Sequence, residues 1–465
     1  MIKIRRFFTI SICSSVVVLC LLPARQAGAQ TERQRPTPPA QRLSTISFEA
    51  IPFFSPDTTG GIVNIHYRIR EDFFVVLRNI ESIRPDDFLA RGEMLIELLN
   101  NDDVSVARHL RTIRLRKTRI PQEQDSTADV QGSVSFAIPP GTYTVFLNVE
   151  DRQSERSFTN RTQKVTTRSP LTGFDVSAPV FVEHPKSPAD RSFTALNRGT
   201  DVYFGERGGH LYAVHLPSSS SGVLATYTLT LEPEQSALGI QEFKGDSLLP
   251  IPGLAVLTAS VDDTLSASSG DVRYAITNPS NGWTTVFLPL PLEQLMPGIA
   301  RLSVTFKADG VERTLDHTFR VLWLNQPAAL RNMDLAIDAL YHIASEEEMG
   351  TFRTFSQSRS IQRFFEFWRK KDPDTTTAYN ELMVEYYRRV DNSIRQYSLG
   401  NETNGYKTDR GRIYILYGTP TDTRRLLTPN RFPREVWTYV SLKRRFIFED
   451  QRRSGDYRLI AVENL

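Results

Sequence analysis

The sequence predicts a multidomain protein in which two all-β sandwich regions precede a C-terminal α+β region. At 465 residues the chain is longer than one hydrophobic core usually serves, and 40% of its residues are hydrophobic, enough to fill several cores. Up to about residue 323, apolar and polar residues alternate with the period of two that half-buried strands require. Beyond that point the period lengthens to about 3.6, which indicates helices.

The first 29 residues have the features of a cleavable export signal. Lys3, Arg5 and Arg6 precede an apolar stretch over residues 7–22, and a small-residue Ala-Gly-Ala cleavage signal ends at Ala29. Polar residues interrupt the stretch, and it is shorter than the roughly 20 apolar residues that span a bilayer, so a membrane anchor is the weaker interpretation. We therefore expect an exported protein with no transmembrane span after signal cleavage.

Residues 30–44 are polar and rich in proline, which predicts a disordered linker between the signal and the first folded region. Both cysteines, Cys13 and Cys20, lie within the signal, so the cleaved chain would hold no disulfide and no cysteine metal ligand. Leu19 precedes Cys20 where a lipid-attachment signal needs a small residue, and this argues against a lipoprotein.

The two β regions are predicted at residues 45–168 and 174–325. In each, a Pro-Gly pair precedes apolar residues at every second position, which is the pattern of a turn followed by a half-buried antiparallel strand. The pairs and the residues after them are Pro140-Gly141 with Tyr143, Val145, Leu147 and Val149, and Pro297-Gly298 with Ala300, Leu302, Val304 and Phe306. A similar turn leads into a late strand of immunoglobulin-like and fibronectin-like sandwiches, where a corner tyrosine follows it, as Tyr143 does here. We therefore expect an internal repeat of such sandwiches.

The C-terminal region, residues 326–465, combines helices with an antiparallel sheet. Apolar stripes predict helices over about 327–344, 358–371 and 377–399, and Gly400 suits a left-handed cap at the end of the third. Four strands are expected at about 413–417, 435–441, 444–450 and 457–460, the first of them central in the sheet. Helices followed by a short meander imply an α+β unit in which the helices cover one face of the sheet.

The charge of the chain does not point to a nucleic-acid partner. After cleavage it would hold 52 Lys and Arg against 53 Asp and Glu. Residues 401–465 are different, with 13 Lys and Arg against 8 Asp and Glu. This basic excess fits either a solvated arginine-rich face, the more common case, or a surface that meets an anionic partner.

Five segments of the C-terminal region together resemble the GWxTD domain of exported bacterial proteins. They are FEFWRKKDPDTTTAYNELMVEYYRRV, NGYKTDRGRIYILYGTP, EVWTYV, FIFED and DYRLI, within residues 330–465. Gly405, Thr408 and Asp409 match the name-giving motif, and Tyr406 replaces its tryptophan. Arg410, Gly411, Gly418 and Pro420 complete the segment. The resemblance implies a place in the periplasm or at the envelope surface and a domain architecture, but no particular activity.

The common catalytic and metal-binding patterns are absent from the sequence. There is no Gly-x-Ser-x-Gly, no His-Glu-x-x-His and no phosphate-binding glycine loop, and His210 and His215 lie on opposite sides of a strand. A calcium loop beginning at Asp372 fails at its sixth and twelfth positions, Thr377 and Met383. Paired carboxylates for glycoside hydrolysis cannot be assigned. We expect no cofactor, no bound metal and no catalytic residues.

Two roles are open for the segment around Asp409. In the structural interpretation, Asp409 closes a turn with backbone hydrogen bonds, Gly411 supplies a special conformation, and a strand begins at Ile413. In the functional interpretation, Asp409 is a base or an anion partner, and Arg410 or Arg412 clamps a carboxylate or phosphate. The structural interpretation needs no missing partner and is preferred.

The sequence therefore predicts an exported, non-catalytic protein that acts in protein–protein recognition or assembly at the cell envelope, with another envelope protein as its partner. One alternative is a carbohydrate-binding protein that uses exposed rings, with Tyr406, Trp437 and Trp283 as the candidates for contact with a glycan. A second is an enzyme of unknown class centred on Asp409.

Overall fold

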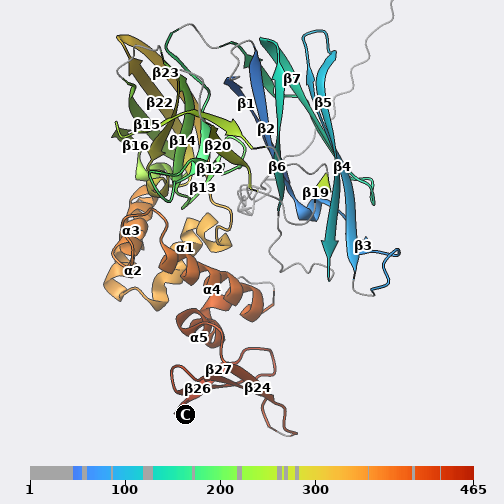
Figure 1. Ribbon diagram of the computed structural model, residues 1–465. Coiled ribbons are helices and arrows are strands. Elements are labelled where there is room, and N and C mark those ends of the chain that lie inside the picture. Colours follow the sequence, from blue (N-terminus) through green and yellow to red (C-terminus); the bar gives the residue numbers. More distant parts are fainter. Residues whose placement is uncertain are drawn as a thin grey trace, which may run out of the picture. The chain divides into compact units, whose positions relative to one another are not determined.

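The computed structural model describes residues 45–54, 60–84, 87–118, 129–169, 173–216, 222–258, 264–265, 271–277, 282–353, 356–400, 404–429 and 431–465. The predicted signal (1–29) and linker (30–44) lie outside the described residues. Strands dominate the chain up to residue 322, and helices followed by an antiparallel sheet form the rest, as the sequence predicts (Figure 1). Among the described residues, no helix combines the length and the apolar character needed to cross a bilayer.

The first β region consists of two sheets around one core. One sheet has the order β1-β2-β6, and the other has the order β19-β5-β4-β7-β8, with β3 beside β4 and β9 beside β7. The strands are β1 (Ile46–Phe54), β2 (Gly61–Arg70), β3 (Leu77–Arg78), β4 (Phe88–Leu99), β5 (Ser105–Lys117), β6 (Asp129–Ile138), β7 (Gly141–Asp151), β8 (Ser157–Asn160), β9 (Lys164–Thr167) and β19 (Thr264–Leu265). A short 3-10 helix, η1 (Glu71–Phe73), follows β2. Because β19 comes from the second predicted region, the boundary between the two β regions is not a clean break in the chain.

The two strands that follow the Pro-Gly pairs form as predicted. β7 begins at Gly141 and β22 (Gly298–Ala308) begins at Gly298, and the alternate apolar residues of both strands are buried. The hydroxyl of Tyr143 donates a hydrogen bond to the Pro139 carbonyl at 2.9 Å. A tyrosine that bonds back to the backbone a few residues upstream is the arrangement expected of a corner tyrosine.

The second β region is built of three sheets. Their orders are β10-β14-β21-β17 with β11 beside β14, β12-β20-β18, and β13-β23-β22-β15-β16. The strands are β10 (Asp175–Val176), β11 (Val180–Glu183), β12 (Ser192–Thr194), β13 (Val202–Tyr203), β14 (Gly208–His215), β15 (Leu224–Pro233), β16 (Gln241–Gly245), β17 (Leu249–Pro252), β18 (Leu254–Leu257), β20 (Arg273–Thr277), β21 (Trp283–Leu290), β22 and β23 (Val311–Leu322), with 3-10 helices η2 (Ser236–Leu238) and η3 (Leu292–Gln294). The sheet of β14 and β21 is buried on both faces: Tyr212 and Val214 join one core, and Leu211 and Ala213 join another.

A buried polar contact joins the two β regions. Successive residues of β2 face opposite sides, so Val63, Ile65 and Tyr67 fill the first core while Asn64 and His66 point the other way. His66 Nε2 lies 2.9 Å from the Tyr274 hydroxyl, and Asn64 donates to the same oxygen at 3.2 Å. Both residues are buried, and these bonds satisfy polar groups that would otherwise be costly to bury.

The helical part is more divided than the sequence predicts. The expected helix at 327–344 is broken into η4 (Ala328–Arg331), α1 (Met333–Ala339) and η5 (Leu340–His342), because Asn332 adopts an extended conformation and caps α1 through the amides of Asp334 and Leu335. α2 (Glu346–Arg353) was not predicted. The other two expected helices are present as α3 (Gln357–Arg369) and α4 (Glu381–Tyr397), and Gly400 has the positive φ of a left-handed residue, 62°.

The central strand predicted at 413–417 is wrong, because these residues belong to helix α5 (Asp409–Tyr417). Five apolar or aromatic residues in a row fit a strand as well as a helix, and the residues at the two ends of the segment favour the helix. Thr408 caps the N-terminus, and Gly418, with φ 78°, ends the helix. The sheet after it has the order β24-β25-β26-β27, with β24 (Asp422–Leu426) added to the three expected strands β25 (Arg434–Tyr439), β26 (Arg444–Glu449) and β27 (Arg458–Asn464).

Glu49 gives the contact between the β regions a pH dependence. Glu49 lies opposite His66 in the β1–β2 ladder, and burial, with a further contribution from nearby Asp201, raises its pKa to about 8. The folded state therefore holds a proton that the unfolded chain releases above its ordinary pKa of 4.5. We predict that the contribution of Glu49 to the free energy of unfolding falls between about pH 4.5 and pH 8, by roughly 2–4 kcal/mol.

Glu49→Gln should abolish this loss, so the variant should gain stability over the natural chain as the pH rises, as measured by urea unfolding at a series of pH values. Burial lowers the pKa of His66 to about 3, so its opposing effect below pH 6.5 is present in both proteins and cancels in the comparison. Parallel pH profiles for the two proteins would contradict the prediction.

Candidate functional site

The motif segment forms the connection between α4 and α5. A short 3-10 helix, η6 (Gly405–Lys407), precedes Thr408, which is the N-cap of α5. The Thr408 hydroxyl accepts a hydrogen bond from the Gly411 amide at 3.0 Å and donates one to the Gly405 carbonyl at 2.8 Å. Thr408 thus satisfies groups on both sides of the junction, which is the work of a helix cap.

The two motif glycines allow close approach of backbones. A Cβ atom on Gly405 would lie 2.1 Å from the Ser393 carbonyl oxygen of α4, and a Cβ on Gly411 would lie 2.0 Å from the Gly405 carbonyl oxygen. No side chain fits at either position without moving the backbone. Gly411 is therefore required for space in a helix, and the predicted special conformation before a strand is wrong.

Tyr406, which replaces the tryptophan of the motif, is buried at 4% exposure. Its hydroxyl donates to the Asp338 carboxylate at 2.6 Å, and its carbonyl lies 2.8 Å from His342 Nε2. Burial, together with Asp338, raises the pKa of the Tyr406 hydroxyl, so it remains a donor. Tyr406 thus connects η6 to α1 through its hydroxyl and to η5 through its carbonyl. The phenol has a polar edge, as an indole would.

Asp409 accepts a hydrogen bond from the backbone amide of Leu459 in β27 at 2.9 Å. The predicted type of interaction, a carboxylate that accepts from backbone, is present, but the amide lies 50 residues away and not in a local turn. As the first residue of α5, Asp409 also places a negative charge at the positive end of the helix. Its carboxylate lies 3.6 Å from the Arg412 guanidinium.

Arg410 is buried, and its guanidinium contacts other residues of the domain, although its Nε has no hydrogen-bond partner among the described residues. Its guanidinium lies 3.3 Å from the Glu435 carboxylate and donates to the Gly455 carbonyl at 2.8 Å. It also lies over the rings of Tyr397 and Tyr457. Glu435 in turn accepts from the Trp437 indole at 2.8 Å, which completes a buried network between α5 and the sheet.

The remaining motif residues lie at the two ends of α5. Arg412 is the one candidate clamp with substantial side-chain exposure, 44%, and it pairs with Asp409. Gly418 donates its amide to the Tyr414 carbonyl at 2.7 Å and accepts from the Tyr439 hydroxyl at 2.7 Å, so it ends the helix and contacts the sheet. Pro420 lies two residues after Gly418 and cannot extend a helix.

The three aromatic residues expected to contact a glycan do not form an exposed platform. Trp437, Tyr406 and Trp283 are buried at 1%, 4% and 4% exposure. Trp437 packs edge-on against Phe448, and Trp283 packs against Phe54 and His215. Because a sugar stacks on an open ring face, these residues are unsuited to the role that the sequence suggested.

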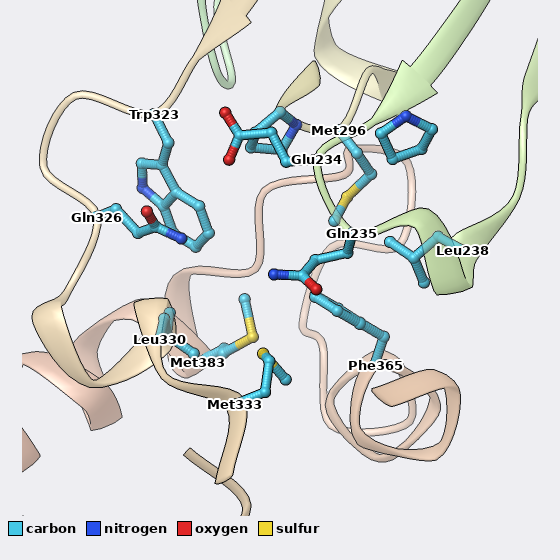
Figure 2. Close-up of a pocket in the computed structure, with 12 residues that line it drawn as sticks. Glu234, Gln235, Leu238, Met296, Trp323, Gln326, Leu330, Met333, Phe365 and Met383 are labelled. Atoms are coloured by element: carbon cyan, nitrogen blue, oxygen red, sulfur yellow. The ribbon is translucent and has the colours of Figure 1, made fainter. Parts of the chain in front are cut away.

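A small pocket that the sequence did not predict lies where the end of β15 and η2 meet the helices (Figure 2). Its volume is about 30 Å³, room for a single water molecule. Three methionines line it, Met296, Met333 and Met383, together with Trp323 and Phe365. Figure 2 shows the labelled side chains directed into the pocket from separate segments, with the carboxamide of Gln235 among them.

A larger pocket of about 570 Å³ adjoins the first and shares Leu238, Met296, Phe365 and Met383 with it. Its rim is polar and includes Gln241 of β16 and Thr375 in the loop before α4. Gln241 Oε1 is buried and accepts no hydrogen bond from any residue that the structure describes. A clue in the sequence was available: three of the six methionines of the chain line this junction, and methionine adapts to varied partners.

Comparison with known proteins confirms the family predicted for the C-terminal region. Residues 308–463 match the model of the GWxTD domain. The match begins within β22 and includes β23, ahead of the predicted start near residue 330. No curated protein matches the chain.

Two solved structures show limited similarity. One is a family 123 glycoside hydrolase from Clostridium perfringens, at 16% identity over 33% of this chain and 30% of the other, with a TM-score of 0.15. The other is a beta-glycosidase from Bacteroides vulgatus, at 11% identity over 59% of this chain and 25% of the other, also with a TM-score of 0.15. The chain thus covers less than a third of either protein, and at this TM-score neither similarity bears on fold or function.

Because Arg410 forms a buried pair with Glu435 and Arg412 forms an exposed pair, replacing Arg410 should lower the free energy of unfolding much more than replacing Arg412. Arg410→Ala leaves the Glu435 carboxylate buried with a weaker partner, Arg425 at 3.7 Å, and should lower the free energy of unfolding by about 3 kcal/mol. Arg412→Ala removes an exposed pair and should cost at most about 0.5 kcal/mol. Urea unfolding of the two variants tests this, and equal stability would contradict a structural role for Arg410.

Proposed function

We propose that this chain is an exported, non-catalytic recognition protein of the bacterial cell envelope, and that the methionine-lined pocket of about 570 Å³ receives an apolar side chain of a protein partner. The pocket is the observation that carries the proposal. The residues that would have formed an active site, Asp409 and Arg410, are engaged in holding α5 to the sheet.

The pocket combines an apolar wall with a polar rim, and the apolar wall is the part that can receive an apolar side chain. Leu238, Met296, Phe365 and Met383 form its apolar wall, and methionine side chains can adjust their three torsions to an incoming group. The volume lies in the range of natural ligand pockets, about 300–1,000 Å³. A bulky aliphatic or aromatic residue of a partner would bury its surface there.

Gln241 supplies a polar contact for the partner. Its buried Oε1 lacks a donor among the described residues, and a buried acceptor without a donor is unfavourable. The Gln241 side chain is only partly buried, so it can turn toward the pocket and accept from the backbone N–H that an extended peptide carries close to each side chain. This pairing of one apolar pocket with one acceptor supports recognition of a polypeptide.

The proposal also includes the fold type of the two β regions that precede the C-terminal domain. The corner position of Tyr143 and the shared start of β7 and β22 after a Pro-Gly pair support two modules of the immunoglobulin or fibronectin type. The basic and apolar residues 1–29 support export.

Site-specific photocrosslinking in the native cells tests the proposal. A photoreactive residue in place of Thr375, which is exposed at the pocket rim, should capture one defined envelope protein. The same residue in place of Thr318, an exposed threonine of β23, serves as the matched control and should not capture it.

Two pocket variants complete the experiment. Met296→Asp places a charge in the apolar wall, and Ala378→Phe fills the pocket, so each should reduce capture at least tenfold, a loss of about 1.4 kcal/mol. Melting temperatures close to that of the natural chain would show that folding is retained. Equal capture at Thr318 and Thr375, or full capture by both folded pocket variants, would refute the proposal.

A further inference from the structure

The hairpin formed by β24 and β25 carries large apolar side chains that no element covers. Leu426, Leu427 and Phe432 are 48%, 73% and 48% exposed. All five residues of β24 are exposed, and β24 is an edge strand of its sheet (Figure 1). Exposed apolar groups gathered in one short segment commonly mark a contact surface.

The same hairpin is strongly basic. Residues 422–434 contain four arginines, Arg424, Arg425, Arg431 and Arg434, and one acid, Asp422. Three of the arginines pair with carboxylates, Arg424 with Asp422 at 2.9 Å, Arg425 with Glu435 at 3.7 Å and Arg434 with Glu449 at 2.7 Å. Arg431 has no ion pair within the described part of the chain. The hairpin thus accounts for much of the basic excess of residues 401–465.

The directions of the apolar side chains distinguish a lipid surface from a protein surface. Leu426 lies opposite Arg434 in the β24–β25 ladder, and Leu427, which is 73% exposed, follows directly after the end of β24. Arg424 and Arg425 are neighbours within β24, so they point to opposite faces of the hairpin. A protein partner would cover one face of the hairpin, whereas the boundary of a bilayer surrounds an inserted tip and contacts all its faces.

We propose that the β24–β25 hairpin binds the surface of an anionic lipid bilayer. Leu426, Leu427 and Phe432 enter the boundary between headgroups and acyl chains, and the arginines behind them contact lipid phosphates. This goes beyond the recognition of a protein partner proposed above and uses a separate part of the molecule. The exposed Arg424–Asp422 pair is weak enough to exchange for a phosphate contact.

Vesicle co-sedimentation tests the proposal with the chain that begins at Gln30, which retains every described residue and lacks the predicted signal. Phosphatidylcholine vesicles are compared with vesicles that also contain about 30% phosphatidylglycerol. The chain should bind the anionic vesicles at least tenfold more tightly than the neutral ones, and added salt should weaken this binding.

Three double variants identify the surface. Leu427→Gln with Phe432→Gln removes apolar contact and should weaken binding at least tenfold. Arg424→Gln with Arg431→Gln should weaken it about 25-fold, at fivefold for each arginine. Leu224→Gln with Ile240→Gln alters two residues of the second β region that are each 70% exposed, and should leave binding unchanged.

Three outcomes would overturn the proposal. They are the absence of binding to anionic vesicles, binding that survives both hairpin variants, and salt-sensitive binding to polyglutamate without binding to vesicles. The last would assign the hairpin to an acidic protein partner. Because the hairpin residues in these variants are exposed, an unchanged melting temperature is expected and separates loss of binding from loss of folding.

Discussion

The hydrogen bond from the Leu459 amide to the Asp409 carboxylate joins the start of α5 to the last strand of the chain. The helices also meet the sheet through the Arg410–Glu435 pair and through the hydrogen bond from Tyr439 to Gly418. Thr408, Gly405 and Gly411 place Asp409 at this position by capping α5 and allowing η6 to lie against it. The most recognisable segment of the sequence is therefore a joint between helices and sheet.

The two proposed binding surfaces use residues other than those of this joint. The apolar pocket lies on the helices at their contact with η2, and the basic hairpin lies at the edge of the sheet. Both are built from residues outside the motif. Proteins that share such a motif can carry different contact surfaces, because a function depends on the site built on a fold and not on the fold itself.

Period and composition in the sequence were enough to predict the β regions, α3, α4 and the last three strands, because long apolar patterns leave little choice of structure. They failed for Ile413–Tyr417, where five apolar or aromatic residues in a row suit strand and helix equally. The helix was decided by the Thr408 cap and by contacts with residues some 50 positions away. The burial of Trp437 and Arg410 and the pocket around Met296 depend on such distant contacts, which periodicity does not contain.

Hydrogen exchange at the Leu459 amide tests the structural role of the motif most directly. In the natural chain this amide should be protected, because it donates to Asp409. In Asp409→Ala it should exchange at least tenfold faster, a loss of about 1.4 kcal/mol, while the amides of β26 keep their protection. Equal exchange at Leu459 in the two proteins would contradict the account, because the Asp409 carboxylate would then not protect this amide.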